Sequence, residues 1–278
     1  EFEESSPEKS RKEIPIQSYI FLGHIYESST TIEASVRNID FGKYDQIWLG
    51  GDLLAETTKY KSNLDYLDSL FDLSNPNTLW SLGNHDIRNG NLNLISDKTK
   101  RPFFYTRHKY GITYIVLNTN GLNPNSLDSS LVESQYQLIK SVCDTISKSS
   151  HLILLSHHTP WNEIDAIGNS RANYNATDYI FNLNSNQKYF DGIYIPFLEN
   201  VRSRGINVIH ISGDYGQFRN GFRYQTNSGI NLLGSGILAE TPYNTRFNRY
   251  GKPDSVLVFT HDVSKRELSW QAVDLDEI

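Results

Sequence analysis

Three adjacent polar residues, Asn84, His85 and Asp86, could carry out phosphate chemistry on a metal ion. An amide oxygen can bind a hard cation, an imidazole can exchange a proton with a phosphoryl oxygen, and a neighbouring carboxylate can fix the imidazole tautomer. A short apolar run before them predicts a buried strand that Gly83 ends, so the three side chains should lie together at a strand end. An ordinary turn could use the same residues, and the interpretation therefore needs support from elsewhere in the chain.

Two further segments repeat this design, in which an apolar strand stops at a residue able to bind a metal. The segment Gln46–Leu53 reaches Asp52 after its apolar run, and the segment Leu152–Trp161 reaches His157 and His158. Carboxylates and neutral imidazoles are common metal ligands. His158 is the adjacent alternative to His157, because the sequence pattern does not decide which of two consecutive side chains faces the site.

Taken in order, these motifs resemble those of the calcineurin-like metallophosphoesterase family, which carries Gly-Asp, Gly-Asn-His followed by Asp or Glu, and a strand-end His. The resemblance covers roughly residues 18–275, and the stretches that look like the family's middle strand, helix and late Gly-Ser turn are 112–119, 132–146 and 231–237. It implies an α/β fold, a four-layer α/β/β/α sandwich of two mixed sheets flanked by helices. The order strand, helix, strand, helix, strand in the first third of the chain also favours a layered α/β domain. From Phe222 onward, alternation and turn signals predict strands of the second sheet.

The family resemblance implies two metal sites, and this chain departs from the family pattern in two motifs. His24 and Tyr26 stand in place of an Asp-x-His pair, and Asp214 and Gly216 stand in place of the two His of Gly-His-x-His. His24 and Tyr26 can still ligate, but a phenol must first lose a proton with a reference pKa near 10. Tyr26 is therefore a poor ligand for Mg or Mn, and a Tyr that only packs and hydrogen-bonds is the alternative.

The remaining donors predict one bound divalent cation, with the other site empty or weak. The expected ligands of that cation are Asp52, Asn84, His157 and Asp214. Mn, Mg, Fe, Zn or Ca could fill such a site, and the added carboxylate favours the harder cations among them. His24 and Tyr26 are left as weak ligands of the other site.

The expected catalytic pair is His85 backed by Asp86, acting as an acid or as a stabiliser of developing charge. The unpatterned stretch Asn162–Lys188 directly follows a ligand strand, so it is expected to overhang the site. Within it, Arg171 is a candidate contact to the phosphate group of a substrate, and His158 is a second candidate.

Three functions fit these residues. The first is a metal-dependent phosphoester hydrolase with an altered, single-metal site, and retention of the complete motif at 83–86 favours it. The second is a catalytically inactive family member that binds a phosphate- or sugar-bearing ligand or a protein partner, which the replaced ligands of the first site favour. The third is a hydrolase of another chemistry, such as ester or amide cleavage at one metal. The ligand expected in the first two cases is a phosphorylated small molecule or a glycan.

Composition excludes some classes of function. The net charge is −6 and the chain has no basic run with interleaved aromatic residues, so a broad nucleic-acid surface is not expected. No apolar run approaches the roughly 18 residues that a transmembrane helix needs. The single Cys143 cannot form an intramolecular disulfide and lies on an apolar helical stripe, which favours a core thiol.

The domain boundary is expected near the start of the chain. Residues 1–13 are polar, charged and contain a proline, which is typical of a flexible tether, and residues 14–278 are expected to form a single domain. A tether left by removal of a signal or anchor would make the protein exported, either periplasmic or secreted. A trimmed tail of a cytoplasmic protein is the alternative.

Overall fold

The structure, a computed structural model, describes residues 16–161, 179–186, 188–215, 221–237 and 254–278. The tether expected at 1–13, and also Arg171 and Gly216, lie outside these residues. Among the helices of the described segments, none has the length and apolar content that a membrane crossing requires.

Within the described residues, the first of two sheets has five strands in the order β11-β10-β1-β2-β3. Its strands are β1 (Gln17–Leu22), β2 (Gln46–Leu49), β3 (Thr78–Trp80), β10 (Ser255–Asp262) and β11 (Glu267–Asp274). The first three run parallel, whereas β10 and β11 are antiparallel to their neighbours. The sequence pattern assigned all late strands to the second sheet, and this is wrong for β10 and β11, because β10 pairs with β1.

The second sheet, as far as the structure describes the chain, has six strands in the order β4-β5-β6-β7-β9-β8. They are β4 (Tyr105–Lys109), β5 (Ile112–Val116), β6 (His151–Ser156), β7 (Asn207–Ser212), β8 (Gly221–Gln225) and β9 (Asn231–Ser235). The four central strands are parallel and the two edge strands are antiparallel. Every residue of β6 is buried, as expected of a central strand covered on both faces.

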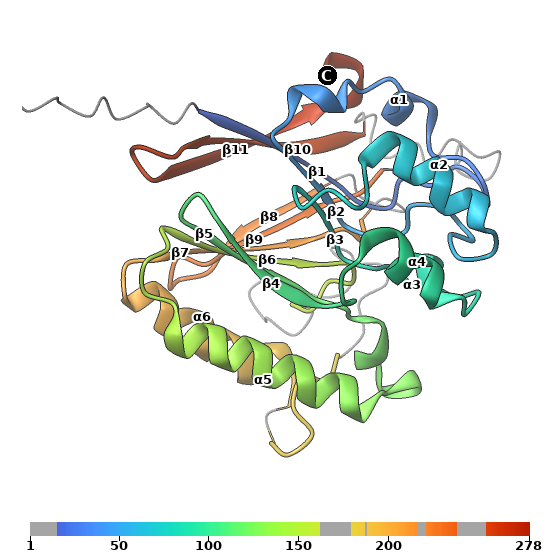
Figure 1. Cartoon of the computed structure of the whole chain (residues 1–278). Coiled ribbons are helices and arrows are strands. Elements are labelled where there is room, and N and C mark those ends of the chain that lie inside the picture. The colour runs from blue at the N-terminus through green and yellow to red at the C-terminus, as the bar shows by residue number, and fades with distance from the viewer. Residues whose placement is uncertain (1–15, 162–178, 187, 216–220, 238–253) are drawn as a thin grey trace, which may run out of the picture.

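Helices cover the outer face of each sheet, which confirms the expected four-layer α/β/β/α arrangement (Figure 1). Those beside the first sheet are α1 (Ala34–Arg37), α2 (Lys61–Phe71), α3 (Asn84–Ile87) and α4 (Leu92–Thr99), with short 3-10 turns at η1 (Phe41–Lys43) and η6 (Leu275–Glu277). Those beside the second sheet are α5 (Ser129–Thr145) and α6 (Phe190–Ser203), with 3-10 turns at η2 (Asn120–Leu122) and η3 (Pro124–Ser126).

Three apolar clusters of described residues hold the layers together. One lies between the first sheet and its helices, and one lies between the second sheet and α5 and α6, where Cys143 is buried as expected. The third lies between the sheets and is rich in aromatic rings, including Trp48, whose ring centroid is 4.7 Å from that of Phe259 and 5.5 Å from that of Tyr114. Large rings bury much apolar area for each residue, so this cluster anchors the two sheets face to face.

The two sheets meet at the carboxyl ends of their parallel strands, and the junction is made of backbone. Gly50 follows β2 and Gly213 follows β7, and a Cβ placed on Gly213 would lie 2.2 Å from the Gly50 carbonyl oxygen. A Cβ placed on Gly23, after β1, would lie 2.4 Å from the Gly213 Cα atom. Only residues without a side chain allow this approach. The residues that follow these glycines are thereby brought to one place.

Candidate metal and phosphate site

Three of the four predicted metal ligands converge on an atom of the fourth, the Nε2 nitrogen of His157. The distance from this nitrogen is 3.2 Å to Asn84 Oδ1, 3.4 Å to Asp52 Oδ1 and 3.8 Å to Asp214 Oδ1. Asp52 and Asn84 come from the ends of β2 and β3 in the first sheet, whereas His157 and Asp214 come from the ends of β6 and β7 in the second. The donors are thus assembled only when the two sheets pack together.

The hydrogen bonding of His157 shows that this donor set fits a cation. Its Nδ1 atom lies 2.8 Å from the carbonyl oxygen of Gly50, and because a carbonyl only accepts, Nδ1 carries the hydrogen. A neutral ring then presents the lone pair of Nε2 to three side-chain oxygens. Such a cluster is repulsive unless a proton or a metal ion lies among its atoms. An imidazole nitrogen with three oxygens is a suitable ligand set for Mn, Fe or Zn.

The negative charges around His157 also favour a positive charge at its Nε2 atom. Burial by itself would lower the pKa of His157, but Asp52 and Asp214 raise it to about 10. Burial would likewise raise the pKa of Asp52, but the neighbouring His157 holds it below its usual range. Without metal the cluster therefore retains a proton on Nε2. A bound cation would replace that proton, and metal binding should release it.

A second donor group adjoins the first through two shared carboxylates. The ligand atoms of His24, Asp52 and Asp214 all lie within 4.8 Å of one another. His24 Nδ1 lies 3.2 Å from the carbonyl oxygen of Ile237, which leaves Nε2 as the available donor. The sequence placed Asp214 with His157 alone, and the structure corrects this, because the turn after β7 also brings Asp214 beside His24.

His158 is buried beside His157, and the two ring centroids are 4.6 Å apart in an edge-on arrangement. Its Nδ1 atom is 2.8 Å from the hydroxyl of Thr119, and its ring is 5.1 Å from that of Tyr179. Burial lowers the pKa of His158 to about 4, so the ring is neutral. Its ligand atom still lies within 4.8 Å of those of His157 and Asp214. The geometry therefore selects His157 as the central ligand and leaves His158 beside it.

Tyr26 lies at the site and packs its ring against two histidine rings. Its ring stacks on that of His85 at 4.6 Å and lies 4.7 Å from that of His24. Burial raises the pKa of the phenol to about 12, and the negative charge of Asp52 adds to the shift. The phenol therefore stays protonated at neutral pH, which disfavours Tyr26 as a metal ligand.

His85 is held on both ring nitrogens and on its backbone. Its Nδ1 atom is 3.2 Å from the carbonyl oxygen of Ala55, and its Nε2 atom accepts from Arg88 Nη2 at 2.9 Å. The backbone N–H of His85 donates to Asp52 Oδ1 at 2.9 Å, and its Nε2 atom is 3.9 Å from Asp52 Oδ2. Burial lowers the pKa of His85. A neutral ring with the hydrogen on Nδ1 accounts for all of these contacts.

Asp86 does not fix the His85 tautomer, contrary to the sequence interpretation. The carbonyl oxygen of Ala55 has that role, because α3 turns Asp86 inward, away from the imidazole. The carboxylate of Asp86 accepts from the backbone N–H groups of Asp52, Leu53 and Gly83, the Thr57 hydroxyl and the Trp80 indole. Burial raises its pKa to about 6, and repulsion from Asp52 adds to the shift. Asp86 thus ties the ends of β2 and β3 together beneath the metal donors.

Arg88 is a site residue that the sequence interpretation missed. It follows α3 and is exposed, and its guanidinium lies against His85. The available signal was its spacing, because a basic residue four positions after Asn84 lies one helical turn further along. The predicted basic contact, Arg171, lies outside the described residues.

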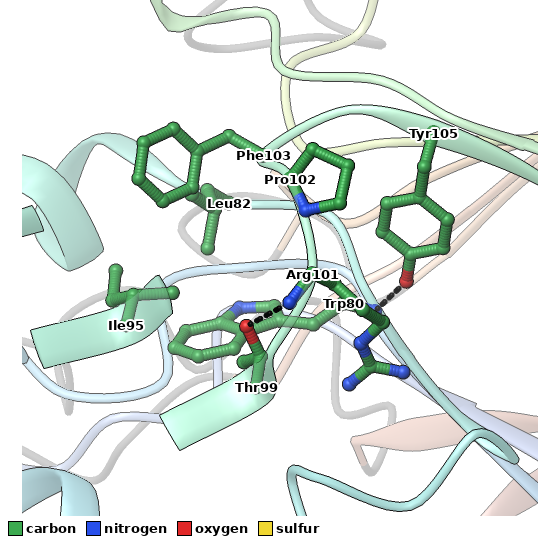
Figure 2. A pocket seen from close by; sticks show the side chains of 8 residues that line it. All are labelled: Trp80, Leu82, Ile95, Thr99, Arg101, Pro102, Phe103 and Tyr105. Atoms are coloured by element: carbon green, nitrogen blue, oxygen red, sulfur yellow. Dashed lines mark hydrogen bonds between the residues drawn. The ribbon is translucent and has the colours of Figure 1, made fainter. Parts of the chain in front are cut away.

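A small cavity next to the site is separate from the metal donors. Figure 2 shows its lining residues, which are Trp80, Leu82, Ile95, Thr99, Arg101, Pro102, Phe103 and Tyr105. Its volume is about 10 Å³, which is room for about one water molecule and not for a phosphate ester. Trp80, which lines the cavity, donates its indole N–H to Asp86 Oδ2 at 3.3 Å. The cavity is therefore connected to the site through the packing of this side chain.

Comparison with known proteins finds a likeness among solved structures, but none among family models or curated proteins. Among solved structures, the crystal structure of a metallophosphoesterase from Sphaerobacter thermophilus aligns with 94% of this chain and 89% of that chain, with 10% sequence identity and a TM-score of 0.36. The function of this chain therefore has to be inferred from its own residues.

Proposed function

We propose that this chain is a metal-dependent phosphoester hydrolase of the calcineurin-like metallophosphoesterase type, with an altered site that holds one cation tightly. The observation that carries the proposal is the convergence of oxygens from Asp52, Asn84 and Asp214 on His157 Nε2. These donors come from the strand ends of two sheets, and they need a positive charge among them. The substrate we propose is a phosphorylated small molecule or glycan, because a chain of net charge −6 is poorly suited to nucleic acid.

The cation would be held by Asp52, Asn84, His157 and Asp214. When bound, a divalent cation polarises a phosphoryl oxygen and stabilises the charge that develops there. The residues of the chain then have distinct parts. The carboxylate of Asp86 accepts a hydrogen bond from the backbone N–H of Asp52 and so fixes the backbone there. Tyr26 stacks on the ring of His85, and the Ala55 carbonyl oxygen accepts from that ring, which holds it next to the carboxylate of Asp52. His85 is thereby presented at the edge of the donor cluster.

A second cation is expected to bind weakly. His24 is the private donor of the second group, and its other two ligand atoms are shared with the first group. Tyr26, the other replaced ligand, keeps its proton because burial raises the pKa of the phenol to about 12. We therefore retain one tightly bound divalent metal for the proposed enzyme.

A second candidate function is binding of a phosphate-bearing ligand without catalysis. The observation that favours it is the full use of both His85 ring nitrogens, one by Ala55 and the other by Arg88. A general acid must offer a proton to the leaving group, and here the Nδ1 hydrogen is engaged and Nε2 is an acceptor. Catalysis would then need the Arg88 contact to open, or the imidazole to act only through the groups that it positions.

One experiment separates the two candidates. Protein purified without chelator is analysed for metals, and hydrolysis of p-nitrophenyl phosphate and bis(p-nitrophenyl) phosphate is measured with Mg, Mn, Fe and Zn. Asp52→Asn serves as the metal-site variant, and Asp144→Asn, on the outer helix α5, serves as the matched control. Hydrolysis that needs both a metal and Asp52 supports the enzyme. Absence of hydrolysis with every metal, in protein that still binds phosphate, would establish the binding function instead.

A further inference from the structure

Among the described residues, the guanidinium of Arg88 differs from those of Arg101 and Arg204, because it does not bind the backbone of another segment. Arg101 donates to the backbone carbonyls of residues 73, 75 and 78, and Arg204 donates to those of residues 143, 146 and 200. Those two side chains tie segments of the fold together. Arg88 is exposed, and within the described segments its one hydrogen bond goes to His85 Nε2.

Arg88 also lacks a carboxylate partner, although the site is acidic. Within the described part of the chain, no acidic oxygen lies within 4.0 Å of its nitrogens. The carboxylate of Asp52 lies on the other side of this contact, with its Oδ2 atom 3.9 Å from the same His85 Nε2 that Arg88 contacts. A guanidinium has five N–H donors, so most of those on Arg88 stay available beside the proposed cation.

His85 holds this guanidinium in place and is itself held. The His85 ring stacks on Tyr26, and its Nδ1 hydrogen points to the carbonyl oxygen of Ala55. Its remaining nitrogen can only accept, and it accepts from Arg88 at 2.9 Å. A neutral acceptor orients the guanidinium without cancelling its charge, which a carboxylate would do.

We propose that Arg88 binds the non-bridging oxygens of the phosphate group of the ligand, and that His85 is its positioning residue. The proposal deepens the proposed function and rests on it for the nature of the ligand. Guanidinium matches phosphate because it is planar and permanently charged, and it can donate two parallel hydrogen bonds. A cation at His157 on one side and Arg88 on the other would then neutralise a dianionic phosphate group between them. The ligand class is a phosphomonoester, whose terminal group carries that charge.

Binding of inorganic phosphate by calorimetry tests the proposal, with both magnesium-loaded and metal-free protein. Arg88→Met should weaken binding about 10-fold in both forms, because a charge-assisted contact is lost. Arg88→Lys keeps the charge but loses the planar pair of N–H donors, so it should weaken binding by a smaller factor. Lys140→Met, which removes one charge from the outer helix α5, should leave the affinity unchanged. Metal content is measured for each variant and is expected to match the wild type.

A double-mutant cycle tests the positioning role of His85. His85→Asn should weaken phosphate binding when Arg88 is present and should have no further effect in the Arg88→Met background. Equal weakening in both backgrounds would overturn the positioning role. Phosphate affinity that is unchanged in both Arg88 variants would overturn the proposal itself.

The same measurements separate this inference from the proposed function. A wild-type protein that hydrolyses phosphoesters and binds phosphate independently of Arg88 would overturn the inference alone. A wild-type protein that binds phosphate through Arg88 but hydrolyses no phosphoester would support the inference and overturn the hydrolase.

Discussion

His157 reaches across the junction of the two sheets and donates its Nδ1 hydrogen to the carbonyl oxygen of Gly50 at 2.8 Å. His157 follows β6 of one sheet, and Gly50 follows β2 of the other. This single bond fixes the tautomer and aims Nε2 at the three donor oxygens. Metal affinity should therefore depend on the packing of the sheets as well as on the ligands.

Asp52→Asn should lower metal affinity about 100-fold or more. Asp52 Oδ1 is 3.4 Å from His157 Nε2, and the amide removes the negative charge that attracts the cation while keeping the shape of the side chain. Titration calorimetry with Mn or Mg measures the change. Asp144→Asn, on the exposed face of α5, is the matched control and should bind metal like the wild type. Undiminished affinity in Asp52→Asn would remove Asp52 from the ligand set.

Metal analysis after extensive dialysis should find about one equivalent per chain. The donor count is the reason, since the His24 group shares two of its three ligands with the His157 group. His24→Ala should leave this equivalent in place, whereas His157→Ala should remove it. Two equivalents that survive dialysis, one of which is lost in His24→Ala, would show that His24 and the shared carboxylates form a second strong site.

His85→Ala should lower turnover about 100-fold or more and leave the metal content near that of the wild type. The reason is that the imidazole lies at the edge of the donor cluster and supports Arg88, whereas Asn84 is the expected ligand. Steady-state kinetics and metal analysis measure the two effects. His108→Ala, on the edge strand β4, is the control. A verified metal-dependent activity that survives His85→Ala would rule out the proposed role of this residue.

Gly213→Ala should destabilise the fold by about 1–3 kcal/mol or more, because overpacking of a closed junction costs this much. The added Cβ would lie 2.2 Å from the Gly50 carbonyl oxygen. This oxygen belongs to the backbone, so it cannot move away by a rotamer change as a side-chain atom could. The free energy of unfolding in urea measures the loss. Gly221→Ala is the control, since the nearest atom to its Cβ would be 3.4 Å away. Equal stability of the two variants would mean that the junction is looser than described.

Acid should destabilise the metal-free protein partly through His210. This buried ring bonds to Ser156 at 2.9 Å, and burial lowers its pKa from 6.5 to about 3. The unfolded chain binds the additional proton, so the contribution is complete above pH 6.5 and is lost as pH falls toward 3. At pH 4.5 the loss should be about 2–3 kcal/mol.

Comparison of variants isolates this contribution. In urea titrations with chelator at pH 7 and pH 4.5, His210→Gln should lose less stability on acidification than the wild type. His108→Gln, at an exposed position, should behave like the wild type. An equal loss in all three proteins would exclude His210 as the source.

The layered fold and the ligand positions were predictable from the sequence because each depends on a local pattern. An apolar run that stops at a glycine or a serine predicts a strand end, and parallel strand ends share one edge of a sheet. Asp52, Asn84, His157 and Asp214 were predicted in this way, and their donor atoms do converge. The helix implied at 132–146 is also observed, as α5.

Contacts between distant segments were not predictable. β10 pairs with β1, although some 240 residues separate them in the sequence. The alternation of apolar and polar residues in a strand does not indicate which other strand it pairs with. Asp86 was assigned to His85 because the two are neighbours, yet consecutive residues of a helix point in different directions, and Asp86 turns to the backbone of β2. Arg88 was missed because its role depends on which side chain lies across from it.

The glycine junction fixes the positions of the metal-donor side chains through the backbone, independently of which side chain stands at each position. His24, Asp52, Asn84 and Asp214 each follow a glycine directly. The close approach of Gly50 and Gly213 locates these positions by backbone alone, so the side chain at each can be exchanged without reopening the interface between the sheets. The preference for one cation over another can therefore be retuned by a few substitutions at the rim, with soft donors for Zn and hard donors for Mg. In this chain, such exchanges would change the donor atoms, and those at Asp52 and Asp214 would change both donor groups together.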